Sequence, residues 1–134
     1  MNVLKDKMVR FLLIVFIVLV FYSIPLLIFK DMQKKIINLE IKEDLNQLSM
    51  WAQLYNNKYR TYQGIENNEE VKKLVDRLNS LQADCQLVIS ERGDRFCAKT
   101  KVFDKKIKNW CVDSFKYSGP AVNNCDYGKE IKCE

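Results

Sequence analysis

Hydrophobic residues fill one long stretch near the start of the chain without a single charge. The stretch reads FLLIVFIVLVFYSIPLLIF; it begins at Phe11 and ends at Phe29. As a helix rising 1.5 Å per residue it would extend over roughly 28 Å, close to the ~30 Å hydrocarbon core of a bilayer. We therefore predict a transmembrane helix over residues 11–29. A kink is expected at Pro25, because proline removes a helical N–H group.

Two other interpretations of this stretch are a removable signal peptide and a buried core helix. The apolar core of a signal peptide is shorter, about 7–15 residues, and ends at a pair of small residues that IPLLIFKDMQ does not offer. A buried helix of such uniform hydrophobicity would need a larger protein around it than the roughly one hundred residues that follow. An uncleaved membrane anchor is favoured.

Beyond the apolar stretch the hydrophobic pattern becomes periodic. Apolar residues recur at steps of three and four, which places them on one face of a helix: Ile41, Leu45, Leu48, Ala52, Tyr55 and Tyr59. No proline or glycine separates Pro25 from Gly64. We expect one long helix, half in lipid and half in a folded domain, that frays around residues 56–62 and stops before Gly64, where glycine can take the left-handed conformation.

A second, shorter helix is predicted after Gly64. Asn67 and Glu70 form a capping pair at its start. Apolar residues then share one face: Val71, Leu74, Val75, Leu78 and Leu81. Both helices need a surface to pack on, and the rest of the chain must provide it.

From Cys85 onward the sequence is typical of β-strands. The segments CQLVIS, RFCAKTKVF and KNWCVDS predict three strands, with a hairpin turn at ERGD in which Gly93 takes positive φ. The tail after them carries three turn signals and predicts irregular structure. The fold class is therefore α+β: a long transmembrane-plus-amphipathic helix packed on a small antiparallel sheet of residues 85–114, with a disulfide-tied C-terminal loop.

Five cysteines lie after residue 84 and none before it: Cys85, Cys97, Cys111, Cys125 and Cys133. Their spacing contains no C-x-x-C pair, which argues against a zinc knuckle or a redox site. Structural disulfides are favoured. Cys85 could meet Cys97 across the hairpin, and Cys111 could close the tail loop through Cys125 or Cys133. The odd thiol stays free or pairs between chains.

Composition and charge narrow the function. The net charge of +5 is spread along the chain, so no basic stripe predicts nucleic-acid binding. The chain has no histidine, the commonest general base and metal ligand. We expect no catalytic residue, no metal and no cofactor, and therefore not an enzyme. Asp113 and Ser114 sit where turn residues bond their own backbone.

Charge also predicts the topology. Lys5, Lys7 and Arg10 make residues 1–10 a short basic tail, which the positive-inside rule leaves in the cytoplasm. The cysteines suit an oxidising compartment on the other side. We expect a single-pass cell membrane protein whose residues 30–134 form one extracytoplasmic domain.

Taken together, these features resemble the type IV pilins and pseudopilins of bacteria. The shared features are a basic leader, an apolar helix that starts with Phe11 and carries a proline, the pattern D-L-x-Q-L-x-x-x-A-x-x-Y from Asp44 to Tyr55, and a small cysteine-bearing sheet with W-C-V-D-S at residues 110–114. The chain departs from the family at the processing site: Arg10 stands in place of the usual glycine, and Val15 in place of the glutamate.

The resemblance implies a structural subunit of a type IV pilus or of a secretion or DNA-uptake pseudopilus. Its expected partners are the lipid bilayer and, through the N-terminal helix, other pilin-like subunits. The alternative is a solitary membrane-anchored binding or sensor domain that does not polymerise.

Overall fold

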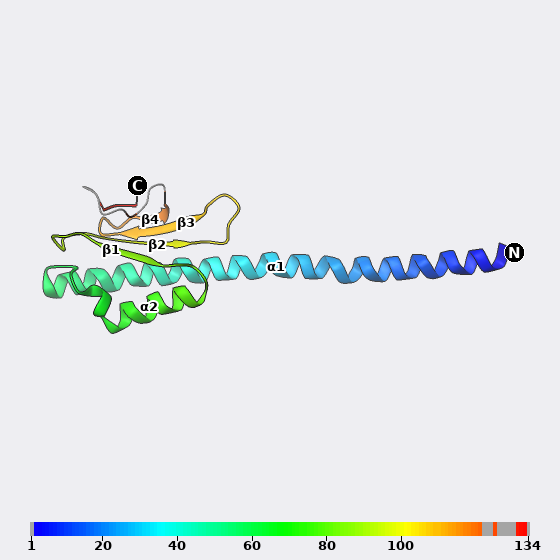
Figure 1. Ribbon diagram of the computed structural model, residues 1–134, viewed down its shortest axis with the longest axis horizontal. Coiled ribbons are helices and arrows are strands. Elements are labelled where there is room, and N and C mark those ends of the chain that lie inside the picture. Colours follow the sequence, from blue (N-terminus) through cyan, green and yellow to red (C-terminus); the bar gives the residue numbers. More distant parts are fainter. Residues whose placement is uncertain (1, 122–124, 126–130, 134) are drawn as a thin grey trace. The chain divides into compact units, whose positions relative to one another are not determined.

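The computed structural model describes residues 2–121, 125 and 131–133; it describes side chains from residue 8 onward, except Tyr22 and residues 24–28. The chain divides into two compact units, Met1–Lys34 and Lys35–Glu134. The element order is α1 (Asn2–Tyr59), η1 (Ile65–Asn67), α2 (Glu69–Ser80), β1 (Gln86–Ile89), β2 (Phe96–Lys101), β3 (Asn109–Asp113) and β4 (Ser118–Pro120) (Figure 1). The fold is α+β, as the sequence predicts.

One helix, α1, contains both the apolar stretch and the amphipathic stretch, and residues 2–10 belong to it as well. It ends at Tyr59, because the next residue, Arg60, takes the left-handed conformation with φ of 60°. Gly64 is also left-handed, with φ of 82°. The predicted end of the helix is therefore correct within a few residues, although a non-glycine residue makes the first break.

Among the residues that the structure describes, no helix has a stretch both long and apolar enough to cross a membrane. The transmembrane assignment of residues 11–29 therefore stays a prediction from the sequence. The side chains of Tyr22 and of residues 24–28 lie outside the described part of the chain, and the kink expected at Pro25 falls among them.

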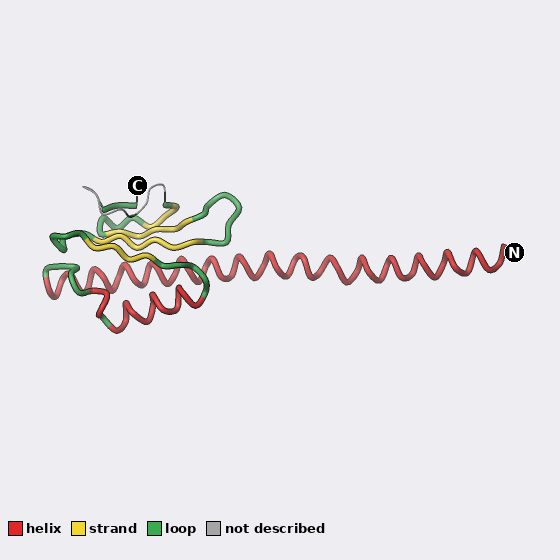
Figure 2. Tube along the Cα trace, in the orientation of Figure 1, coloured by secondary structure: helices red, strands yellow, loops and turns green. Residues whose placement is uncertain are grey.

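The four strands form one antiparallel sheet in the order β1-β2-β3-β4 (Figure 2). Hairpin pairing accounts for this order, since each strand pairs with the next along the chain. The turn between β1 and β2 contains Gly93 at φ of 67°, as predicted. The sequence predicts three strands and misses β4, because Ser-Gly-Pro carries no β-strand signal.

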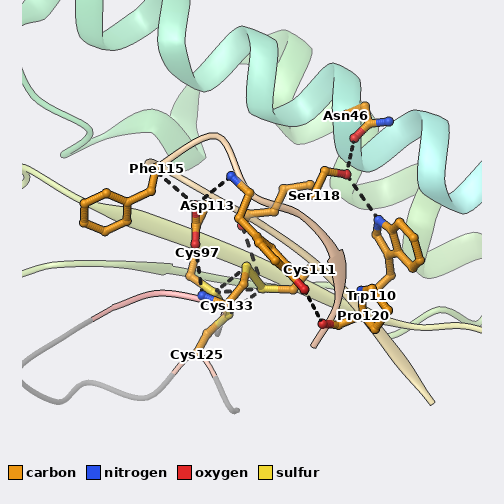
Figure 3. The surroundings of a disulfide bond; sticks show 12 residues. Asn46, Cys97, Trp110, Cys111, Asp113, Phe115, Ser118, Pro120, Cys125 and Cys133 are labelled. Carbon is orange, nitrogen blue, oxygen red and sulfur yellow. Dashed lines mark hydrogen bonds between the residues drawn. A yellow bond between two sulfur atoms is a disulfide. The ribbon is translucent and has the colours of Figure 1, made fainter. Parts of the chain in front are cut away.

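Both faces of the sheet are covered, which explains why burial does not alternate simply along β2. Phe96 and Ala98 face the helices and join a core with the α1 residues. Cys97 faces the other way and joins a second cluster, with Cys111, Cys125, Ile131 and Cys133. Figure 3 shows the cysteines of this second cluster together with Asp113 and its partners. The sheet thus separates a helix layer from a disulfide layer.

The helix layer contains residues 35–59 of α1 and all of α2, which lie on the same side of the sheet (Figure 1). Fully buried residues of this core include Ile41, Leu45, Leu48, Ala52, Val71, Leu78, Phe96, Ala98 and Val112. Each large aliphatic side chain buried this way stabilises the fold by about 1.5–3 kcal/mol.

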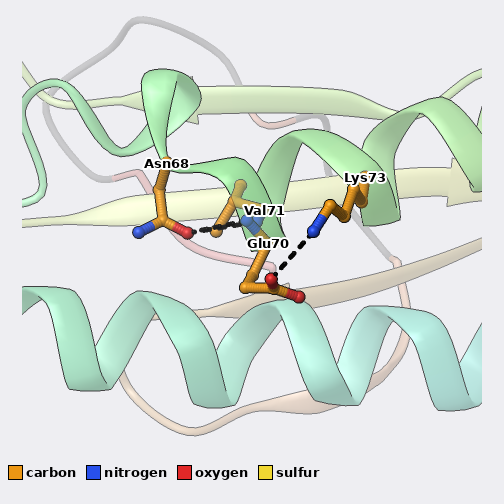
Figure 4. Close-up of polar contacts among 4 residues, drawn as sticks. All are labelled: Asn68, Glu70, Val71 and Lys73. Carbon is orange, nitrogen blue, oxygen red and sulfur yellow. Dashed lines mark hydrogen bonds and ion pairs between the residues drawn. The ribbon is translucent and has the colours of Figure 1, made fainter.

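The N-terminal cap of α2 is one residue later than the sequence predicts. Asn67 belongs to the short helix η1, and Asn68 caps α2 instead. Asn68 Oδ1 accepts the backbone N–H groups of Glu70 and Val71 at 3.1 and 3.3 Å (Figure 4). Both residues are asparagine, so the choice between them depends on backbone conformation, which the sequence pattern does not reveal.

Candidate helix-packing surface

Within the unit Lys35–Glu134, helix α1 carries apolar residues on two opposite faces. Its buried face consists of Ile41, Leu45, Leu48 and Ala52, all 0% exposed. The helix-packing surface is our name for the opposite face, formed by Ile36, Leu39, Met50 and Leu54. These side chains are 59, 67, 52 and 49% exposed.

Helical geometry places these four residues on one side of α1, where Glu43 and Gln47 lie between Leu39 and Met50. Ile36 and Leu54 are separated by about five full turns of 3.6 residues, so they point the same way, and Leu39 and Met50 lie within about 60° of them. At 100° per residue the buried face is centred about 180° away. Within the part of the chain that the structure describes, this second apolar side of the helix is exposed.

An open groove of about 410 Å³ lies along the surface, lined by Leu39, Lys42, Glu43, Asn46, Gln47 and Met50. The polar residues on one edge of the groove contact the sheet. Lys42 Nζ lies 4.0 Å from the centre of the Trp110 ring, and Asn46 Oδ1 accepts the Ser118 hydroxyl at 2.7 Å (Figure 3). The apolar edge, Leu39 and Met50, is left exposed.

The unit Met1–Lys34 also exposes apolar side chains. Phe11, Phe16 and Phe21 are 66, 66 and 73% exposed, and Phe29 is 60% exposed. A few exposed apolar residues are normal on any protein, but a contiguous apolar surface marks a contact with lipid or with another protein.

Disulfides are present, but one expected pairing is wrong. Cys97 bonds Cys125 and Cys111 bonds Cys133, with Cα–Cα distances of 5.8 and 5.7 Å. Cys85 is free. In the β1–β2 register Cys97 faces Val88, three residues beyond Cys85. An odd offset puts the two side chains on opposite faces of the sheet, so they cannot meet across the hairpin.

The free Cys85 thiol is poorly suited to reaction. Burial, with a smaller contribution from the neighbouring Asp84 carboxylate, raises its pKa to about 12. At neutral pH almost no thiolate forms, and the thiolate is the species that attacks disulfides and alkylating agents. A disulfide between chains through Cys85 is therefore disfavoured.

The other polar and aromatic candidates have structural roles. Asp113 Oδ1 accepts the N–H groups of Phe115 and Tyr117, and its Oδ2 accepts that of Cys133. Tyr62 is 4% exposed and its ring centre lies 4.9 Å from that of Phe96. Tyr55 is half-buried and donates its hydroxyl to the Gln63 carbonyl. These contacts belong to the fold rather than to a ligand site.

One ion pair between a buried carboxylate and a half-exposed arginine was not predicted from the sequence. Asp44 is 0% exposed, and Arg77 Nε of α2 lies 3.2 Å from its Oδ2. Burial raises the pKa of Asp44 above its usual range, while Arg77 acts to lower it. The only sequence signal is that Asp44 lies at the edge of the buried stripe, because nothing in the pattern connects it with Arg77.

Comparison of the chain with family models, with curated proteins and with solved structures finds no match. A functional assignment must therefore come from the residues and their arrangement.

Proposed function

We propose that this chain is a pilin-like structural subunit of a type IV pilus or of a secretion or DNA-uptake pseudopilus. Residues 11–29 anchor it in the cell membrane, with the N-terminus in the cytoplasm and the C-terminal domain outside. Subunits assemble by packing the helix-packing surface of α1 against the same helix of other subunits.

The observation that carries the proposal is the exposed apolar face of α1. Ile36 and Leu39 are more than half exposed although the same helix buries its other side completely. Exposing such a face to water is unfavourable by about 25 cal/mol per Å² of apolar surface. Contact with another helix would remove this penalty. The uncharged sequence of residues 11–29 continues this apolar character toward the N-terminus.

Two further features support the proposal. Lys42 and Glu43 carry opposite charges in the groove between Leu39 and Met50, which suits a contact with another copy of the same helix. The two disulfides suit a domain that folds in an oxidising compartment.

The solitary anchored domain remains the second candidate, and the departures from the pilin pattern favour it. Arg10 precedes Phe11, and Val15 occupies the position of the usual glutamate. Leader cleavage would shorten the chain, so the intact mass of the membrane-extracted protein separates the candidates. A shortened chain supports the subunit, and the full length of Met1–Glu134 favours the solitary domain.

Cell fractionation tests assembly itself. Filaments sheared from cells of the source organism, the membranes and the soluble fraction are probed with an antibody against residues 35–134. We expect the chain in the sheared filaments, and its loss from them in Leu39→Glu. Lys72→Glu is the matched control, because it changes charge on the exposed side of α2. Wild-type protein found only in membranes would overturn the subunit proposal; wild-type protein found only in the soluble fraction would overturn both candidates.

A further inference from the structure

Four sulfur atoms gather on the face of the sheet away from the helices. Apart from the two disulfide bonds, Cys97 Sγ lies 3.2 Å from Cys111 Sγ and 3.8 Å from Cys133 Sγ. Cys111 Sγ lies 3.7 Å from Cys125 Sγ. Each sulfur therefore contacts at least one sulfur besides its bonded partner (Figure 3).

Three of the six distances among the four sulfurs are close to those in a tetrahedral metal site. Four thiolates at 2.3 Å from a zinc ion are separated from one another by roughly 3.8 Å. Three non-bonded contacts are already within several tenths of an ångström of this value. The Sγ atoms of Cys97, Cys111 and Cys125 lie within 4.8 Å of one another, and all four cysteines are buried.

We propose that Cys97, Cys111, Cys125 and Cys133 bind one zinc ion as four thiolates when the two disulfides are reduced. Breaking the S–S bonds lets each bonded pair separate to the spacing that the other contacts already have. β2 and β3 hold two of the ligands in place, while the tail brings the other two. This inference does not depend on the proposed function.

The surroundings of the cluster suit its charge. A zinc ion with four thiolates carries a net charge of about −2. Lys99 faces Cys111 in the β2–β3 register, so the two side chains share a face of the sheet. The Asp113 carboxylate is also close, but its oxygens are occupied by three backbone N–H groups.

The two states exchange by reduction and metal binding. Two dithiol molecules supply four electrons and four protons; the Cys97–Cys125 and Cys111–Cys133 bonds break, four thiols form, and each dithiol closes into its own disulfide. Zinc then binds the four sulfurs as thiolates, and the four thiols release their protons to water. The disulfide state belongs to an oxidising compartment and the zinc state to a reducing one.

Spacing along the sequence argued against zinc because no two cysteines form a C-x-x-C pair. The fold supplies the missing proximity. Cys97 and Cys111 lie on neighbouring strands with a diagonal offset of two residues, since Cys97 faces Asp113 in the register. Placement on neighbouring strands thus brings two cysteines together, as a C-x-x-C pair does in a zinc finger.

The test uses the full chain, reduced without oxygen by a phosphine that does not compete for zinc. Each disulfide takes two electrons from one phosphine, which becomes its oxide with an oxygen from water, and the two protons of that water end on the thiols. Co²⁺ is then titrated as a coloured probe and displaced by Zn²⁺, while circular dichroism follows folding.

We expect one metal ion per reduced chain, with the thiolate-to-cobalt absorption of a four-sulfur site, and none for the unreduced chain. Cys85→Ser should bind like wild type. Cys125→Ser should bind more weakly by ~10–100-fold or more, since the loss of a residue that only hydrogen-bonds a metal ligand already has an effect of that size. The proposal is overturned if the reduced chain, folded or unfolded, binds no metal, or if Cys125→Ser and wild type bind alike.

Discussion

Asp44 places a carboxylate inside the contact between α1 and α2, where its two oxygens accept no hydrogen bond from the described residues. Arg77 compensates the charge at 3.2 Å, although its own side chain is half exposed and also contacts Glu40. A buried ion pair of this kind contributes little net stability, but its separation is costly.

Single and double substitutions test the Asp44–Arg77 ion pair. Asp44→Asn should leave the free energy of unfolding unchanged or raise it by up to about 2 kcal/mol, because it removes the buried charge. Arg77→Met should lower it by about 1–3 kcal/mol, because Asp44 loses its cation. The double variant should recover most of that loss. Urea unfolding of residues 35–134 measures all three, and equal losses from both single substitutions would contradict the assignment.

A second prediction concerns pH. Burial raises the folded-state pKa of Asp44 above the ordinary 3.8, so between these two values the folded state binds more protons than the unfolded state. Stability of the wild type therefore increases, relative to Asp44→Asn, as the pH falls through this window. The difference between the two proteins should be greatest at neutral pH and should disappear below pH 3.8. A difference that stays constant with pH would show that Asp44 is not the titrating group.

Single residues were the hardest to predict from the sequence. The two ends of a hairpin place Cys85 and Cys97 close in the chain, yet a disulfide between them depends on register, because a shift of one residue reverses which face a side chain occupies. The Asp44–Arg77 contact joins residues of two helices whose relative position no local pattern contains. The left-handed Gly64 and Gly93 were predictable because glycine is the usual residue at positive φ.

At the scale of secondary structure, the contact between α1 and the sheet should dominate stability. Leu48 is 0% exposed in the core that both share. Leu48→Asp would bury an unpaired carboxylate, costing several kcal/mol in a domain whose total stability is about 5–15. Glu43→Lys on the exposed side should change stability by no more than about 0.5 kcal/mol. Thermal melts of residues 35–134 compare them, and equal tolerance would mean that the helix does not rest on the sheet.

The cap of α2 offers a prediction with an adjacent control. Asn68→Ala should lower stability by about 1 kcal/mol, because the N–H groups of Glu70 and Val71 lose their acceptor. Asn67→Ala changes the same residue type one position earlier and should have little effect, since the side chain of Asn67 is exposed. Denaturant midpoints measure both. A larger loss of stability from Asn67→Ala would show that Asn67 is the capping residue, as the sequence predicts.

Helices followed from periodicity where the pattern was long, and strands followed from β-forming residues between turn signals. The stripe from Ile41 to Tyr55 identified the buried face of α1, and the segments after residue 84 identified β1, β2 and β3. β4 was missed because its three residues pair only through the backbone with β3. Short elements of this kind depend on their neighbours rather than on their own sequence.

For the whole molecule, the sequence predicted the α+β class but not the exposed apolar residues on the other side of α1. The steps of three and four marked the buried residues, whereas Leu39 and Met50 lie outside that stripe. Leu39 and Met50 share a face because α1, Asn2–Tyr59, is unbroken between them. The clustering of four cysteines likewise required the sheet register.

The central claim is that subunits meet through the helix-packing surface, and cross-linking between chains tests it most directly. In a Cys85→Ser background, Leu39→Cys and Met50→Cys each place one thiol on that surface, and Lys72→Cys places one on the exposed side of α2. Membranes of cells making each variant are oxidised and analysed on non-reducing gels. The account predicts disulfide-linked dimers for Leu39→Cys and Met50→Cys and few for Lys72→Cys. Absence of dimers from both α1 variants, or equal yields from all three, would contradict it.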